Sequence, residues 1–157
     1  MANKEKITIK LNNLKFDAQN PRLPMRLQGV TDENKVIDYM VKYGNVTELM
    51  LSIGETGYSE AEPLLVVKEG TDKYIVVEGN RRLAALKLLN DSELTKVRIQ
   101  SINSVVSGAK YIPEEVPCIV YASREDVLDY LGYRHITGVK DWGALEKARY
   151  LDQLYQI

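Results

Sequence analysis

Residues 74–89 read YIVVEGNRRLAALKLL, and this stretch decides the fold. β-Branched and aromatic residues run up to Glu78, whereas strong helix formers follow Arg82. Gly79 permits the sharp turn between the two patterns. The first N–H groups of the helix have no partner within it, and two adjacent arginines add donors beside them. The stretch therefore predicts a phosphate site where a strand meets a helix.

The two arginines also have an interpretation without a ligand. Arg81 and Arg82 would then be solvated helix residues that pair with surface acids. Cations at a helix N-terminus, however, oppose the helix dipole by roughly 0.3–1 kcal/mol each. Because a bound anion offsets this cost, the anion site is the preferred interpretation.

Strand and helix patterns alternate along the chain, which favours one α/β or α+β domain. The expected strands are 7–11, 64–68, 73–78 and 117–122, and the expected helices are 32–43, 47–54 or 47–57, 81–90, 123–132 and 141–156. The strands 64–68 and 73–78 are expected to form a hairpin. Asp32, Thr47 and Ser123 are the expected helix caps. Residues 92–97 are expected to form a short helix, and residues 101–109 a loop.

Composition restricts the class of protein. The 157 residues contain 21 Lys and Arg against 22 Asp and Glu, so the surface as a whole is not built for nucleic acid. The single cysteine, Cys118, excludes an internal disulfide and fits a buried strand position. No stretch approaches the ~20 apolar residues of a membrane span, and no signal-peptide core is present. We expect a cytoplasmic protein, and we expect no dedicated metal site because zinc-ligand spacing is absent.

The residues Gly79-Asn80-Arg81-Arg82-Leu83-Ala84-Ala85 resemble the phosphate-binding box of the ParB/sulfiredoxin superfamily, typically Gly-Glu-Arg-Arg before a small-residue helix. The surrounding order agrees, since Asn20-Pro21-Arg22 follows the first strand and Pro63 precedes another. The chain is similar to a ParB-type N-terminal domain over about residues 7–120. This resemblance implies an α+β fold, a small mixed sheet with packed helices and a helical C-terminal segment. The nucleotide-binding core is expected over 1–122, and a helical extension over 123–157 is expected to continue in a longer natural chain.

The resemblance also implies a ligand, a nucleoside triphosphate (CTP or ATP) with Mg²⁺. The residues that it assigns to the phosphates and the adjoining loop are Gly79, Asn80, Arg81, Arg82, Asn20 and Arg22. Asn80 stands where the family has a glutamate implicated in hydrolysis. Because an amide is no general base, the sequence predicts binding more firmly than turnover.

A second ParB element, Glu-Asn followed by Arg, precedes a helix that ends in Glu-Glu-Ala. Counting back from residues 146–148 places this element on 135–139, where the residues do not match. Arg134, His135 and Thr137 are the candidates there for phosphate contacts. A structural imidazole is the alternative for His135.

Glu48 is the candidate catalytic residue. Serine kinases that share this fold use a glutamate on the corresponding helix as base, so the resemblance gives Glu48 a role. The alternative is a first-turn glutamate that interacts with the helix dipole. Sulfiredoxin chemistry is excluded, because it needs a cysteine and a histidine inside the box.

The sequence thus predicts a ParB-like domain whose nucleotide gates DNA association or self-association, with a homodimer as one form. The expected setting is DNA partition, plasmid or phage maintenance, or defence in a protein of prokaryotic, plasmid or phage origin. DNA is expected to bind through a segment beyond residue 157. A weak CTPase-like activity, a serine-kinase-like phosphotransferase and a Mg²⁺-dependent nuclease are the alternatives.

Overall fold

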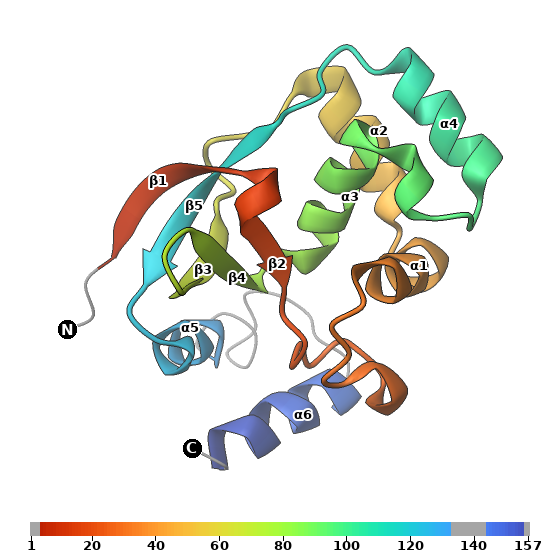
Figure 1. The fold of residues 1–157 in the computed structure, drawn as a ribbon. Helices are drawn as coiled ribbons and strands as arrows, with labels where there is room; N and C mark the ends of the chain where they lie inside the picture. The colour runs from red at the N-terminus through yellow and green to blue at the C-terminus, as the bar shows by residue number, and fades with distance from the viewer. Residues whose placement is uncertain (1–3, 133–143, 156–157) are drawn as a thin grey trace.

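A mixed sheet of five strands forms the centre of the fold, in the order β1-β5-β3-β4-β2 (Figure 1). The computed structural model describes residues 4–132 and 144–155. The strands are β1 (Glu5–Lys10), β2 (Leu14–Phe16), β3 (Leu64–Glu69), β4 (Lys73–Glu78) and β5 (Glu115–Tyr121). β3 and β4 form the expected antiparallel hairpin, and β1 pairs antiparallel with β5. The pairs β2–β4 and β3–β5 are parallel, so the predicted small mixed sheet of an α+β fold is confirmed.

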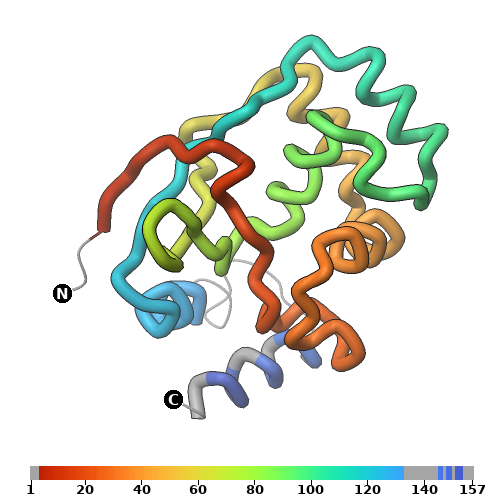
Figure 2. The backbone as a smooth tube through the Cα atoms, viewed as in Figure 1, coloured from red at the N-terminus to blue at the C-terminus, as the bar shows by residue number. Residues whose placement is uncertain are grey.

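Six α-helices accompany the sheet in the described part of the chain. They are α1 (Glu33–Tyr43), α2 (Val46–Thr56), α3 (Asn80–Asn90), α4 (Ile99–Gly108), α5 (Arg124–Leu131) and α6 (Ala144–Tyr155). Short 3₁₀ turns cover Leu11–Asn13, Met25–Leu27 and Ser92–Leu94. The backbone trace in Figure 2 shows α1 to α4 gathered together, with α5 and α6 away from that group. None of these helices has the length and apolarity of a membrane span.

The two faces of the sheet pack against different helices because successive strand residues point to opposite sides. Leu64 and Val66 join the main core, to which α1 to α4 contribute. Leu65 lies in a second cluster with side chains of α5, among them Val127 and Leu128. α5 thus covers the face of the sheet that the other helices leave.

Two caps are confirmed and one is wrong. The Asp32 carboxylate accepts a hydrogen bond from the Asn34 N–H, and the Ser123 hydroxyl accepts one from the Asp126 N–H. α2, in contrast, has its N-cap two residues earlier than expected, at Asn45 with φ 54°. Thr47 lies inside the helix, and its hydroxyl has no hydrogen-bond partner among the described residues.

The expected loop over residues 101–109 is wrong, because this segment forms α4. Ile102 is fully buried there, and Val105 and Val106 pack on the main core at helical spacing. Their β-branched side chains lower helix propensity, but burial of one face outweighs that preference. The three-residue strand β2 gives no pattern of its own, and the sequence did not predict it. The domain boundary at residue 122 stays a prediction.

Candidate functional site

Gly79 forms the turn between β4 and α3 with a left-handed backbone, φ 105° and ψ 20°. A Cβ atom at this position would lie 2.4 Å from Cδ2 of the buried Leu64 and 3.1 Å from an Nη of Arg82. Both the backbone angle and the close approach therefore require glycine. The helix that follows presents its first unpaired N–H groups at this turn, as the sequence predicted.

Arg81 is held at the turn by the connection between α1 and α2. Its Nε donates to the Gly44 carbonyl at 2.5 Å. Burial, and then the positive charges of Arg22 and Arg82, lower the pKa of the Arg81 guanidinium. Three arginines from two separate segments thus concentrate positive charge at the start of α3, where the helix dipole is also positive.

Arg82 is fixed to the segment before β3. One Nη donates to the Glu62 carbonyl at 2.6 Å and to the Tyr58 hydroxyl at 3.0 Å. The other Nη lies 3.8 Å from the Glu78 carboxylate. This side chain therefore orders the rim of the site as well as adding charge to it.

Asn80 is buried, and both ends of its amide are engaged by the fold. Its Nδ2 donates to the Val76 carbonyl at 2.8 Å, and its Oδ1 accepts from the Asp17 N–H at 3.1 Å. The side chain thus joins the end of β4 to the loop after β2. Of the groups of Asn80, the backbone N–H at the start of α3 is the one placed for an anion.

The loop after β2 carries Asn20 and Arg22 to the same place. The Asn20 side chain accepts a hydrogen bond from the Arg22 N–H at 3.0 Å, which closes a tight turn. Arg22 then forms an ion pair of 3.2 Å with Glu146 on α6. Asn20 therefore shapes the loop, and Arg22 is its charged group.

These residues line one cavity of about 810 Å³ between the sheet, the loop and α5. Of the predicted residues, Gly79, Asn80, Arg81, Arg82, Asn20 and Arg22 lie together in its wall. A smaller hollow of about 240 Å³ beside Tyr39 and Tyr43 shares Arg22 and Arg81 with it. The cavity is large enough for a nucleotide-sized ligand.

Other predicted residues do not join this group. Glu48 is exposed in the first turn of α2 and is absent from the cavity wall, where its neighbour Leu49 lies. Its role as a base stays a prediction. Arg134, His135 and Thr137 lie outside the described residues.

Sequence reasoning missed the far end of the cavity and its link to α6. Lys4 and Tyr121 line the end away from the box, and no local motif marks either of them. Arg149 on α6 donates to the backbone carbonyls of Pro21 and Leu23, which ties α6 to the loop. Contacts between segments so distant in sequence leave no local signal.

The carboxylates near the box are the groups that could bind a metal ion. Within residues 4–132 and 144–155, no three His, Cys, Asp or Glu side chains gather as a metal cluster. Glu78 does line the cavity beside the box. Mg²⁺ commonly binds through one or two carboxylates and the phosphates of its ligand, and this donor set fits that mode.

Comparison with known proteins places the chain in a family. The model of the ParB N-terminal domain matches residues 30–116, more than half of the chain, and this range includes the box. No curated protein sequence matches. Among solved structures, the chain is similar to the C-terminally truncated chromosome-partitioning protein ParB from Caulobacter crescentus, complexed with CTP-gamma-S. The TM-score is 0.50 at 18% identity, over 96% of this chain and 62% of that one, so the likeness is one of fold. By its match to the domain model, this chain belongs to the ParB N-terminal domain family.

Proposed function

We propose that this domain binds a nucleoside triphosphate, CTP or ATP, in the cavity, with its phosphates on the turn at Gly79. The observation that carries the proposal is the convergence of Arg22, Arg81 and Arg82 on the N-terminus of α3. Repulsion among these cations raises the free energy of the unliganded site, and a polyphosphate would relieve it. Membership of the ParB N-terminal domain family and the fold shared with a CTP-gamma-S-bound ParB support the same ligand class.

Mg²⁺ would accompany the triphosphate. Glu78 is the carboxylate in the cavity wall that would meet it, directly or through water. The ion would neutralise phosphate charge beside this carboxylate. Asn80 supplies no base for hydrolysis, since its amide is engaged by Val76 and Asp17. Binding rather than rapid turnover is therefore the proposed activity.

Binding would act on α6, which gives the site a way to gate association. Glu146 of α6 is paired with Arg22, so a phosphate that takes Arg22 would compete with Glu146. Arg149 and Gln153 hold the same helix to the carbonyls of the loop at residues 19–23. A nucleotide bound at this loop would therefore change how firmly α6 is held. The change at α6 or its surroundings would alter the association of the domain with DNA or with a second copy of the chain.

We also propose a biological setting for the domain. A nucleotide-gated domain of this family fits DNA partition, plasmid or phage maintenance, or defence. The similar ParB is a chromosome-partitioning protein, and this chain corresponds to 62% of its structure. DNA would be held by a segment beyond residue 157.

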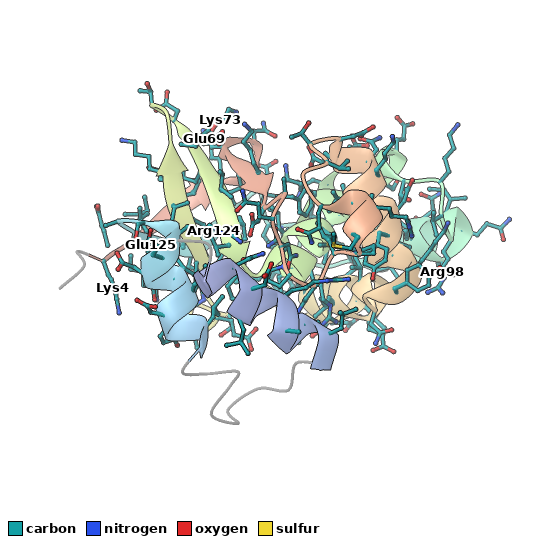
Figure 3. The ribbon with its side chains drawn as sticks, turned by 90° about the horizontal axis from the view of Figure 1, so that it is seen from below. Lys4, Glu69, Lys73, Arg98, Arg124 and Glu125 are labelled. Atoms are coloured by element: carbon teal, nitrogen blue, oxygen red, sulfur yellow. The ribbon has the colours of Figure 1, made fainter. Side chains whose placement is uncertain are left out.

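Calorimetric titration with each of the four Mg²⁺–nucleoside triphosphates tests the proposal. We expect micromolar-range binding of CTP or ATP by the unmodified domain and at least a tenfold loss in Arg81→Ala. Arg98→Ala is a matched control, because Arg98 lies at the opposite end of the molecule from α5 (Figure 3). Absence of heat with all four nucleotides, or equal losses in the two variants, would contradict the proposal.

A further inference from the structure

The solvent-facing side of α1 carries basic residues. The residues of this helix that are buried in the main core are Val36, Ile37, Met40 and Val41. On the opposite side, Lys35 and Lys42 are exposed and lie two turns apart, so both side chains leave the helix in the same direction. The two lysines are about 10 Å apart along the helix axis, at about 1.5 Å per residue. The exposed face of α1 is therefore cationic over most of its length.

Two tyrosines and an arginine extend this face to one side. Tyr39 and Tyr43 stand one turn apart, with ring centroids separated by 5.1 Å and planes inclined by 47°. The Arg26 guanidinium, from the 3₁₀ turn that precedes α1, lies 5.8 Å from the Tyr39 centroid. Tyr43 is 67% exposed. A third cation and an exposed phenol thus lie beside the two lysines.

The start of α4 adds two more cations at the C-terminal end of α1. The Arg98 guanidinium donates to the carbonyls of Val41 and Lys42 at 3.3 and 3.4 Å. Lys96 is exposed two residues before it. The helix dipole favours a cation at the C-terminus of α1, so Arg98 alone would be explained as a cap. It does not explain Lys35, which lies in the first turn of α1, where the dipole opposes a cation.

The acidic residues of α1 do not neutralise this surface. Glu33 forms an ion pair of 2.9 Å with Lys87 of α3, and the Asp38 carboxylate accepts a hydrogen bond from the buried Thr95 hydroxyl at 2.5 Å. Within the part of the chain that the structure describes, no ion pair includes any of the five cations of this basic face, which are Arg26, Lys35, Lys42, Lys96 and Arg98. Their charge is therefore available to a partner, although the whole chain has a net charge of −1.

We propose that the basic face of α1 binds the sugar-phosphate backbone of duplex DNA. The separation of Lys35 and Lys42, about 10 Å, spans about three phosphates of one strand, which follow one another at about 3.4 Å along the DNA axis. Lysine, arginine and tyrosine side chains all contact phosphate, and such contacts carry no sequence information. The convex outer side of a helix packs against a duplex backbone, whereas unpaired bases need a groove in which to stack. This contact belongs to the domain itself, requires no bound nucleotide and is separate from the DNA-binding segment proposed beyond residue 157.

Fluorescence anisotropy tests the proposal, with the 157-residue chain titrated into a labelled duplex of about 20 base pairs at several salt concentrations. With about four phosphate contacts, the logarithm of the binding constant should fall against the logarithm of salt concentration with a slope of about −3 to −4. The pair Lys35→Gln and Lys42→Gln should reduce the size of this slope by about two and weaken binding at about 50 mM salt by at least about tenfold. The pair Lys35→Arg and Lys42→Arg keeps both charges and should keep the slope.

The pair Lys10→Gln and Lys68→Gln is the matched control, because it removes the same charge from exposed lysines of β1 and β3. Thermal unfolding shows that each variant is folded. No binding of the duplex at about 50 mM salt, or an equal change of slope in the control pair, would overturn the proposal. Tighter binding to a single strand of the same length, or to vesicles that contain phosphatidylserine, would also overturn it.

Nucleotide binding is a separate readout, because neither Lys35 nor Lys42 lines the cavity. The glutamine pair should therefore lose far more affinity for the duplex than for the nucleotide, and a parallel loss of both would overturn the proposal. A chain that binds the duplex but no nucleotide would support the basic face of α1 and contradict the proposed function. A chain that binds a nucleotide but no duplex would do the reverse.

Discussion

Asp17 and Asn80 are joined by a buried hydrogen bond in which the Asp17 N–H donates to Oδ1 of Asn80 at 3.1 Å. The Asp17 carboxylate in turn accepts a hydrogen bond from Arg124 at 2.5 Å. Arg124 lies at the start of α5 (Figure 3). Arg124 also donates to Gln153 on α6. The box, the loop after β2 and the two last helices are therefore connected by one polar network. The family's glutamate position is occupied here by a residue that holds this network together.

Asn80→Ala should destabilise the domain by roughly 1–3 kcal/mol, since it leaves the Asp17 N–H and the Val76 carbonyl without their buried partner. Urea unfolding followed by circular dichroism measures this change. Asn34→Ala is the control, because the Asn34 side chain is exposed and the cap bond of α1 uses its backbone N–H. If the two variants unfold at the same urea concentration, Asn80 does not hold the loop.

Gly79→Ala should cost roughly 1–3 kcal/mol of stability and weaken nucleotide binding, because a side chain is strained at φ 105° and its Cβ meets Leu64. Gly70→Ala separates these two causes. Gly70 also has a positive φ, 72°, but nothing lies within 4 Å of its Cβ position. Unfolding free energies should therefore fall further for Gly79→Ala than for Gly70→Ala. Equal losses would show that the close approach to Leu64 has no effect.

Local signals determined how much of this site the sequence could predict. The turn at Gly79 was predictable because strand formers, glycine and helix formers follow one another within a few residues. The role of the Asn80 amide was not, since its partner Asp17 comes from a distant loop. The same holds for Glu146, whose pairing with Arg22 depends on how α6 packs. α4 escaped prediction because its β-branched residues favour helix only when one face is buried.

Asp17 should make stability depend on pH. Burial raises the pKa of its carboxyl, and the Arg124 charge only partly opposes this effect. As the pH rises, the unfolded chain therefore loses this proton first, near 3.8, the ordinary pKa of an aspartate. Stability from this group is present below that pH and is lost as the pH rises through the higher pKa of the folded state. Compared with Asp17→Asn, the unmodified domain should therefore have an unfolding free energy that decreases as the pH rises above about 4.

Paired urea titrations of the two proteins between pH 3.5 and 7 measure this difference. Asp17→Asn keeps a side chain of similar size and removes the titration. As the pH rises, the unfolding free energy of the unmodified protein should decrease relative to that of Asp17→Asn. A constant gap would show that Arg124 balances burial, and a gap that grows in favour of the unmodified protein toward pH 7 would show that Arg124 outweighs it.

Cys118 should be unreactive in the folded domain. It is fully buried in β5, and burial raises the pKa of its thiol to about 12, so the nucleophilic thiolate is scarce at neutral pH. A chromogenic disulfide reagent should label the native domain only at the rate at which it opens, and should label it within the mixing time in 6 M guanidinium. Fast labelling of native protein would contradict the buried position.

Glu146→Gln should tighten nucleotide binding. The Glu146 carboxylate lies 3.2 Å from Arg22 and also acts on Arg81, so it occupies part of the positive field that the phosphates would use. Removing its charge leaves a hydrogen-bonding side chain of the same size but abolishes the competing anion. We expect a two- to fivefold gain in affinity by calorimetry, consistent with about 0.4–1 kcal/mol for a partly exposed ion pair. The gain should shrink as salt rises, because the competing interaction is electrostatic.

Glu114→Gln removes one negative charge outside the cavity wall and controls for net charge. A gain of the same size in Glu114→Gln would assign the effect to net charge, and a loss in Glu146→Gln would mean that Glu146 holds Arg22 in place for the phosphates.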